Sequence, residues 1–318
     1  MTSNYVSTIA IVGVGGHSGR YMTEALLATG KHVVTALTRL GSTSSLPTGI
    51  KSVTVDYTDK DGLVAALRGQ DVLIITLSVN VVEVAHPILV EAAAAAGVSW
   101  ILPNSFGPDT SGTIDSGVFE DVPFFATQPA QREHILSLGR SSFIDISTGF
   151  WYEWSVAMPR FGFNFAERTA TLFDDGETKM SLSTWPQVGR AIASLLSLPI
   201  ASEDGPSLNS YRNKIVYINS FTVTQHEILE RQRDDWTVDY VPSSEMLARG
   251  REALKTGDMS GFVLQIYARF FYPLLELGNT EKTHGTINTA LGLTKDDIDE
   301  ATRAAIARAK EVKPYGAA

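Results

Sequence analysis

The sequence predicts an α/β protein built on a Rossmann-type, doubly wound parallel sheet. Short β-branched runs alternate with helical runs through the first 150 residues, which is the pattern of parallel strands joined by crossover helices. The first run ends in the glycine-rich segment 13–19 and leads into a helical run. After Phe150 this alternation stops, and a chain of 318 residues is long enough for a second domain.

Six strands and four helices are expected in the first half, because apolar runs of strand length are separated by turn residues and helical patterns. The strands are Thr8–Val12, His32–Thr38, Ser52–Asp56, Val72–Leu77, Trp100–Leu102 and Phe143–Ser147. The helices are Gly19–Ala28, Asp61–Leu67, Val82–Ala96 and Gln128–Leu138. Near-continuous apolar strands such as 72–77 are typical of a sheet that helices cover on both faces.

The second half is less regular and rich in aromatic residues. A turn is expected at Asp174–Gly176, a helix at Pro186–Leu198, a strand at Lys214–Ile218 and a helix near Val223–Gln232. The last helix is predicted from Thr294 to Val312, capped by Thr294. Its apolar stripe is Ile298, Ala301, Ala305, Ala309 and Val312. We expect that stripe to pack onto its own domain.

Composition narrows the class of protein. The absence of cysteine excludes disulfides, thiolate metal sites and a cysteine nucleophile. A net charge of −9 without basic runs argues against nucleic-acid binding. The longest apolar stretch, Val81–Val98, contains Glu83, Pro87 and Glu91 and is therefore interpreted as a buried helix and not a membrane span. The sequence has no signal-peptide pattern, so we expect a soluble, cytoplasmic protein. It has no metal-ligand spacing, so no metal is expected. The expected partner is a small-molecule substrate, and the oligomeric state, monomer or homodimer, is left open.

The glycine-rich segment has the spacing of a dinucleotide-binding loop, with Gly13, Gly16 and Gly19 at every third position. Ser18 stands where the tighter G-x-G-x-x-G pattern has its third glycine. Glycines allow a tight turn and a close approach of pyrophosphate, whose charge meets the free N–H groups of the following helix. We therefore expect Gly13, Gly16, Ser18 and Gly19 to bind a dinucleotide, with His17 beside it. The alternative is a purely structural turn.

The residues after the second strand favour a phosphorylated ribose. An NAD site has a carboxylate there, but the chain has no acidic residue between Glu24 and Asp56. Arg39 ends the strand instead, and the hydroxyl residues Ser42, Thr43 and Ser44 follow. A guanidinium with hydroxyl groups suits a 2′-phosphate, so NADP(H) is the predicted cofactor. The alternative for Arg39 is a solvated surface side chain.

Further cofactor contacts are expected at the carboxyl ends of the strands, where ligands of doubly wound sheets bind. Asp56 and Tyr57 follow the third strand, at the expected adenine edge, although Asp56 could equally cap the next turn. The ends of the fourth and fifth strands supply Leu77, Ser78, Asn104, Ser105 and Phe106.

Several short motifs, taken in order, carry a family resemblance. They are Gly13/Gly16/Gly19, Thr38–Arg39, Asp56–Tyr57 with Leu63 and Leu67, Asp71–Ile74, Leu102–Gly107, Ser147–Phe150, Val188–Arg190 and Leu291–Leu293. In this order the sequence resembles the NmrA-like and isoflavone-reductase-like group of atypical short-chain dehydrogenases, over nearly the whole chain.

The resemblance implies an NADP-binding Rossmann domain at 1–153 and a smaller, discontinuous α+β substrate-binding domain at 154–185 and 220–318. Segments 186–200 and 214–219 would return to the Rossmann domain, and the substrate pocket would lie between the two. Members of the group include NADPH-dependent reductases of aromatic and other specialised metabolites. They also include regulators that bind a dinucleotide without known turnover.

The sequence departs from that group at the proton donor. The reductases carry a lysine at the position where this chain has Gln131, and no lysine occurs between Lys60 and Lys179. No tyrosine has a lysine four residues later, so the Tyr-x-x-x-Lys pair of classical short-chain dehydrogenases is also absent. Both usual proton donors of the fold are therefore missing.

Other residues are candidates for the chemistry. Glu153 and Tyr152 follow the sixth strand, and a carboxyl group among aromatic side chains has a raised pKa. Gln131 could orient a carbonyl group or a water molecule. His134 lies one helical turn later, on the same face of the helix, and is a candidate proton donor. The alternative for His134 is an ordinary half-exposed position on a helix. A flat substrate would contact aromatic side chains, unless these belong to the core; they are Phe106, Phe150, Trp151, Trp154, Tyr267 and Phe271.

The leading interpretation is an NADP(H)-dependent reductase of a small aromatic or heterocyclic metabolite, acting on a carbonyl, imine or activated double bond. A close variant keeps the dinucleotide bound while another group catalyses a cyclisation or isomerisation. The alternative is an NADP(H)-sensing regulatory protein without turnover.

Overall fold

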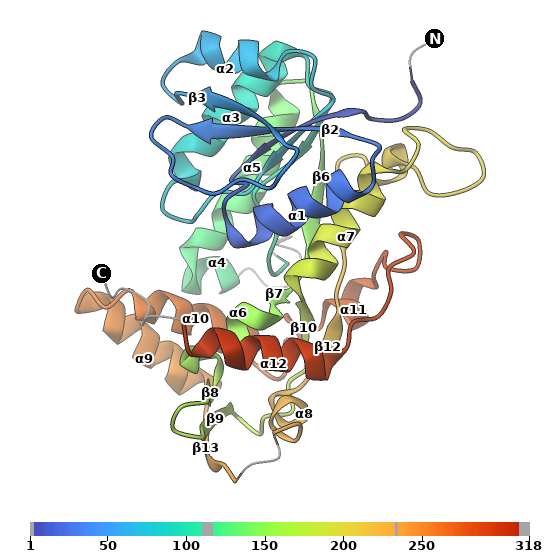
Figure 1. The fold of residues 1–318 in the computed structure, drawn as a ribbon. Coiled ribbons are helices and arrows are strands. Elements are labelled where there is room, and N and C mark those ends of the chain that lie inside the picture. The colour runs from blue at the N-terminus through green and yellow to red at the C-terminus, as the bar shows by residue number, and fades with distance from the viewer. Residues whose placement is uncertain (1–2, 110–116, 233–234, 312–318) are drawn as a thin grey trace.

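The computed structural model describes residues 3–109, 117–232 and 235–311. Its centre is a parallel sheet of seven strands in the order β11-β6-β5-β4-β1-β2-β3 (Figure 1). The strands are β1 (Thr8–Val12), β2 (Val33–Arg39), β3 (Lys51–Val55), β4 (Val72–Ile75), β5 (Trp100–Leu102), β6 (Ser142–Ser147) and β11 (Lys214–Tyr217). The doubly wound parallel sheet and its predicted strands are therefore confirmed, with ends that differ by at most two residues.

Helices cover both faces of this sheet. One face carries α1 (His17–Ala28) and α7 (Trp185–Leu196); the other carries α2 (Lys60–Leu67), α3 (Val82–Ala96) and α5 (Thr127–Ser137). Alternate residues of β1 divide between the two layers, since Ile9 and Ile11 pack with α1 and α7 whereas Ala10 and Val12 pack with α2 and α3. In the part of the chain that the structure describes, no helix is long and apolar enough to cross a bilayer.

Helices α1 and α7 pack closely because a glycine lies at their contact. A Cβ atom added to Gly189 would lie 2.5 Å from the carbonyl oxygen of Tyr21. Both α7 and β11 come from the segments that were expected to return to the first half, and both lie on the central sheet. The exact division into domains at residue 153 stays a prediction.

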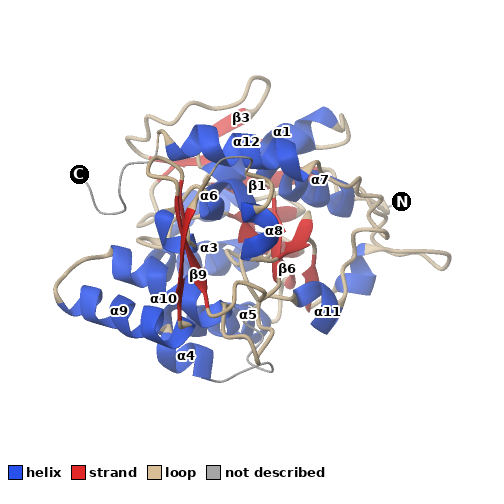
Figure 2. Cartoon of the chain, turned by 90° about the horizontal axis from the view of Figure 1, so that it is seen from below, coloured by secondary structure: helices blue, strands red, loops and turns tan. Residues whose placement is uncertain are grey.

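The second half forms a smaller layer below the sheet, with two three-stranded sheets of order β12-β10-β7 and β13-β9-β8. Their strands are β7 (Phe150–Trp151), β8 (Phe163–Asn164), β9 (Thr169–Phe173), β10 (Met180–Ser183), β12 (Phe221–Val223) and β13 (Thr237–Val241). The helices are α6 (Tyr152–Val156), α8 (Gln225–Leu229), α9 (Ser243–Lys255), α10 (Ser260–Phe270), α11 (Thr280–His284) and α12 (Ile298–Ala309). The short helix α4 (Gly117–Asp121), from the first half of the chain, also packs on this lower core. Seen from below, α12 lies on the same side of the molecule as α1, and α9 and α10 lie on another side (Figure 2).

Two predicted helices begin later than expected. The last helix begins at Ile298 and is capped by Asp297, so the prediction of a Thr294 cap is wrong. Asp296 accepts hydrogen bonds from Thr184, Ser220 and Arg190, and these bonds hold the chain extended up to the cap. Ala301 and Ala305 of the stripe are buried in the lower core, as expected, and Val312 lies outside the described residues.

The other late start is at α8. Residues 221–223 pair with β10 as a strand, so the helix predicted from Val223 begins only at Gln225. Thr224 and Glu227 form a capping box at its start, in which each side chain accepts a hydrogen bond from the backbone N–H of the other residue.

Candidate functional site

The glycine-rich loop connects β1 to α1 and leaves its backbone open to a ligand. Gly13 has φ +87°, and a Cβ atom there would lie 1.8 Å from the carbonyl oxygen of Thr76. A Cβ atom on Gly19 would lie 2.2 Å from the carbonyl oxygen of Gly13. Gly16 is the N-cap of α1 and provides no side-chain acceptor for the first N–H groups of the helix. These donors and the positive end of the helix dipole fit a pyrophosphate.

The loop after β2 lies against the glycine-rich loop. A Cβ atom on Gly15 would lie 2.3 Å from Cβ of Ser44, so the two loops touch. Arg39 ends β2 with an exposed side chain, and Ser42 and Thr43 are exposed in the loop that follows. The Arg39 charge is near Tyr57 and opposes the rise in the pKa of that phenol that burial causes. This arrangement leaves a guanidinium and hydroxyl groups available beside the predicted ribose.

Asp56 is bonded within its own turn. Its Oδ1 accepts hydrogen bonds from the N–H of Thr58 at 2.8 Å and from the hydroxyl of Thr58 at 2.7 Å. These bonds lower the pKa of the exposed Asp56 carboxyl. The geometry matches the turn-capping alternative for Asp56, and its predicted contact with adenine stays a prediction.

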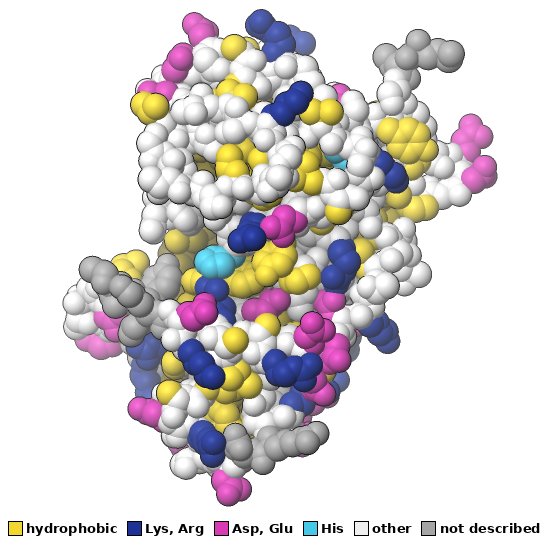
Figure 3. Space-filling model, viewed as in Figure 1, with side chains coloured by type: hydrophobic (Ala, Val, Ile, Leu, Met, Phe, Trp, Pro, Cys, Tyr) yellow, Lys and Arg dark blue, Asp and Glu magenta, His cyan; other side chains and the backbone are white. Residues whose placement is uncertain are grey.

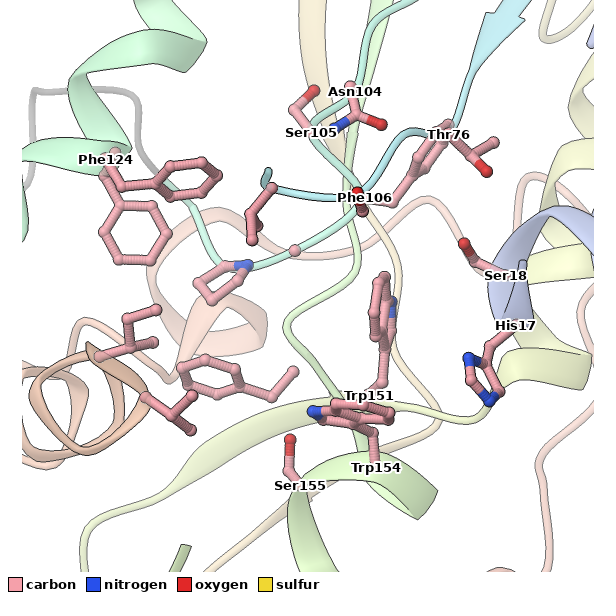
Figure 4. A pocket seen from close by; sticks show the side chains of 18 of the residues that line it. His17, Ser18, Thr76, Asn104, Ser105, Phe106, Phe124, Trp151, Trp154 and Ser155 are labelled. Carbon is pink, nitrogen blue, oxygen red and sulfur yellow. The ribbon is translucent and has the colours of Figure 1, made fainter. Parts of the chain in front are cut away.

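A cavity of about 460 Å³ begins at the glycine-rich loop and extends below the carboxyl ends of the strands. Its upper wall brings together predicted cofactor residues from three loops: Gly16, His17 and Ser18 after β1, Leu77 and Ser78 after β4, and Asn104, Ser105 and Phe106 after β5. Figure 4 shows His17 and Ser18 on one side of this space and Asn104, Ser105 and Phe106 above it. Segments distant in the sequence therefore form one continuous wall.

Hydrogen bonds hold the loop after β5 in place. The Asn104 side chain bonds to the backbone of Leu77 in both directions. The Ser105 hydroxyl donates a short hydrogen bond to Asp145, whose other oxygen accepts from Arg132 at 2.5 Å. Burial raises the pKa of Asp145, and the Arg132 guanidinium opposes that rise. Ser105 is thus anchored in a buried polar network next to the cavity.

Aromatic side chains form the lower part of the cavity. Among the predicted substrate contacts, Phe106, Phe150, Trp151, Trp154 and Tyr267 line it. Phe271 does not: it is 1% exposed and packs edge-on against Phe173 and Phe161 in the lower core. The prediction for Phe271 is therefore corrected, since it is a core residue.

Sequence reasoning missed the far wall of the cavity. It consists of Phe124, Phe125 and Gln128 after α4, Ser155 on α6, and Phe262, Val263 and Ile266 on α10. The rings of Phe124 and Phe262 meet edge to face, with centroids 5.7 Å apart. Phe262 and Ile266 are one helical turn apart, so the spacing that marks an apolar helix face was present, but nothing local distinguishes a cavity face from a core face.

The four predicted catalytic residues do not line the cavity. The carboxyl group of Glu153 accepts a hydrogen bond from the backbone N–H of Trp185 at 3.3 Å, and burial raises its pKa to about 7, in the expected direction. The Tyr152 hydroxyl bonds to Thr302 at 2.8 Å, and burial raises its pKa to about 12. Gln131 is buried on α5 and does not face the cavity, and His134 lies 3.9 Å from Glu91 on α3. The structure therefore does not bring these four side chains together.

No metal centre is evident in the residues described. Across 3–109, 117–232 and 235–311, no group of three His, Asp or Glu side chains is placed to hold an ion.

Comparisons with known proteins agree with this architecture. The sequence model of the NmrA-like family matches residues 6–186. An Aspergillus flavus protein described as oxidoreductase aprR is 29% identical over 302 residues, which cover 92% of this chain and 96% of the relative.

Solved structures resemble the fold over nearly the full length. One, from work on pinoresinol-lariciresinol and phenylcoumaran benzylic ether reductases, has a TM-score of 0.75 at 19% identity and covers 92% of this chain and 97% of that one. The Vitis vinifera leucoanthocyanidin reductase in complex with NADPH has a TM-score of 0.73 at 15% identity and covers 95% and 100%.

Proposed function

Because the chain belongs to the NmrA-like family, we propose that it is an NADP(H)-dependent oxidoreductase that reduces a small, flat aromatic or heterocyclic metabolite. The observation that carries this proposal is one continuous cavity whose upper wall contains the glycine-rich loop and whose lower wall is aromatic. Such a cavity suits a dinucleotide and an apolar acceptor in contact with each other.

The cofactor half of the proposal rests on the fit of the first loops. The start of α1 would hold the pyrophosphate, and Arg39 with Ser42, Thr43 and Ser44 would hold the 2′-phosphate. NADPH is the cofactor of the Vitis vinifera reductase that shares this fold. When bound, the reduced nicotinamide supplies a hydride to a carbonyl, imine or activated double bond.

The substrate half rests on the lower wall. Phe124, Phe150, Trp154 and Phe262 offer apolar surfaces that would stack on a flat ring and exclude water from it. Ser155 is a polar group at this end, below the cavity (Figure 4). Its Oγ accepts a hydrogen bond from the Tyr267 hydroxyl at 3.1 Å, and its own hydroxyl proton would be donated to the substrate. We infer that Ser155 orients an oxygen or nitrogen atom of the substrate.

Two measurements test the proposal. Titration with NADPH should give saturable binding, and NADPH oxidation should follow when aromatic carbonyls, imines or conjugated alkenes are added. A raised KM for the acceptor substrate in Ser155→Ala would support the inference that Ser155 orients the substrate. Product formed without NADPH consumption would indicate the cyclisation or isomerisation variant, and the absence of any NADPH binding would exclude both.

A regulatory role is the second candidate, because Gln131 replaces the lysine of the reductases and does not face the cavity. An NADP(H) sensor would bind a partner protein differently with and without the dinucleotide. Recovery of the same partners under both conditions would remove this candidate.

A further inference from the structure

The side chain of Arg308 lies between two tryptophan rings beside the glycine-rich loop. Its Cζ atom is 4.5 Å from the ring centroid of Trp154 and 4.9 Å from that of Trp185. The imidazole of His17, the first residue of α1, faces the same two rings, with centroid distances of 5.7 Å to Trp154 and 4.9 Å to Trp185. Residues from α6 and α7 thus hold a guanidinium of α12 next to the start of α1.

Among the residues described, this guanidinium makes no ion pair within 4 Å, although the charges of Glu311 and Glu153 act on it from farther away. The Nε–H group of Arg308 is buried and has no hydrogen-bond acceptor among the residues described, and the same holds for the indole N–H groups of Trp151 and Trp185. The carboxyl of Glu153 bonds to the backbone of Trp185 instead. Leaving a buried donor unsatisfied costs free energy. The three N–H groups belong to side chains in mutual contact, since Trp151 and Arg308 both pack against the ring of Trp185, and we infer that an acceptor binds near them.

The position of these donors indicates the kind of acceptor. The first N–H groups of α1 lack a side-chain cap and point outward from the same end of the helix that His17 begins. The pKa of His17 is lowered, mainly by burial and next by the positive charge of Arg308. The electric field of the Arg308 guanidinium therefore reaches the start of α1. In the space-filling view, hydrophobic side chains, a histidine and charged side chains of both signs gather between α1 and α12 (Figure 3).

We propose that Arg308 is a cofactor-binding residue whose guanidinium binds a phosphate oxygen of the dinucleotide pyrophosphate. The inference rests on the proposed function. A guanidinium stacked between rings keeps its N–H groups in a fixed plane and can bind two phosphate oxygens at once. The helix α12 packs on α6, so the bound dinucleotide would join the lower half of the molecule to the glycine-rich loop.

The test compares dinucleotide affinities of the full chain and three variants by calorimetric titration. Arg308→Ala and Arg308→Gln should each weaken NADPH and NADH equally, by about tenfold, because both dinucleotides contain the pyrophosphate. Adenosine 2′-monophosphate lacks it and should bind the variants as it binds the parent. Arg303→Ala is the matched control, since Arg303 is an exposed arginine on the same helix.

The glutamine variant keeps much of the side chain that covers the tryptophans, so it separates the loss of charge from a loss of folding. Affinities for both dinucleotides within about twofold of the parent in Arg308→Gln would overturn the inference. A loss confined to NADPH would also overturn it, because the contact would then be with the 2′-phosphate. If the parent protein binds neither dinucleotide, the proposed function fails, and this inference fails with it.

Discussion

The side-chain amide of Asn104 exchanges two hydrogen bonds with the backbone of Leu77: Oδ1 accepts from the N–H at 2.5 Å, and Nδ2 donates to the carbonyl oxygen at 3.1 Å. These bonds tie the ends of β4 and β5 together at the upper wall of the cavity. Asn104→Ala should lower the free energy of unfolding by about 1–3 kcal/mol, because both backbone groups lose their partner. Urea denaturation measures this, with Asn80→Ala at the exposed rim as control. Equal midpoints for the two variants would contradict the expected role.

Arg39 is expected to distinguish the two nicotinamide cofactors. Arg39→Ala should weaken NADPH binding by about 1–3 kcal/mol and leave NADH binding almost unchanged, because only NADPH carries the 2′-phosphate. Fluorescence titration with both cofactors gives the comparison. Arg68→Ala removes another exposed arginine of the same half and should change neither affinity. Similar losses for NADPH and NADH would argue against a contact between Arg39 and the 2′-phosphate.

Glu153 makes stability depend on pH. Burial raises its pKa from 4.5 to about 7, so between these values the folded protein holds a proton that the unfolded chain releases. The stability that Glu153 contributes is therefore fully present below pH 4.5 and is lost as the pH rises from 4.5 through about 7. Relative to the parent protein, Glu153→Gln should gain up to about 3 kcal/mol between pH 4.5 and pH 8.

Urea denaturation at several pH values measures this gain. Glu203→Gln, in an exposed loop, should show no such gain. Stability curves of parent and Glu153→Gln that run parallel across this pH range would mean that Glu153 has an ordinary pKa.

Gly189 sets the distance between α1 and α7. Gly189→Ala should destabilise the protein by about 1–3 kcal/mol, because its Cβ would lie 2.5 Å from a backbone oxygen that cannot rotate away. Thermal or urea unfolding shows the loss. Ser194→Ala, on the same helix, removes a hydroxyl without adding volume and should have a much smaller effect. An undiminished unfolding midpoint in Gly189→Ala would show that the two helices can separate freely.

Phe262 should affect the substrate and not the cofactor. It lies on α10 at the far wall and meets Phe124 edge to face. Phe262→Ala should raise KM for an aromatic substrate by about tenfold, from the lost ring contact, with NADPH affinity unchanged. Met259→Ala, an exposed residue just before α10, is the control. A loss of NADPH affinity with an unchanged KM would place the substrate elsewhere.

The sequence allowed the sheet to be predicted because its signals are local. Most strands of the first half, such as β1 and β4, are apolar or β-branched runs between turn residues. The predicted bounds of Trp100–Leu102 and Val82–Ala96 agree with the structure at both ends. The start of α12 was misplaced for a different reason. Asp296 is held by residues at positions 184, 190 and 220, and no local pattern records contacts over that distance.

The cavity was predicted only in part, for the same reason. The loops after β1, β4 and β5 converge because the carboxyl ends of parallel strands meet at one edge. The far wall depends on how α10 packs against the turn at Phe124, more than a hundred residues earlier. Tyr152 and Glu153 illustrate the remaining difficulty. They directly follow a strand that leads to the cavity, but their side chains turn toward Thr302 and Trp185, whereas those of Trp154 and Ser155 face the cavity.

The pairing of β11 with β6 limits how this protein can be cut into pieces. A fragment that ends at residue 186, where the family match ends, lacks β11 and most of α7. The backbone edge of β6 would then be open to pair with strands of other molecules, and the apolar surface beneath α7 would face water. Such a truncated fragment is expected to aggregate. The upper half therefore depends for its solubility on a segment that follows part of the lower half in the sequence.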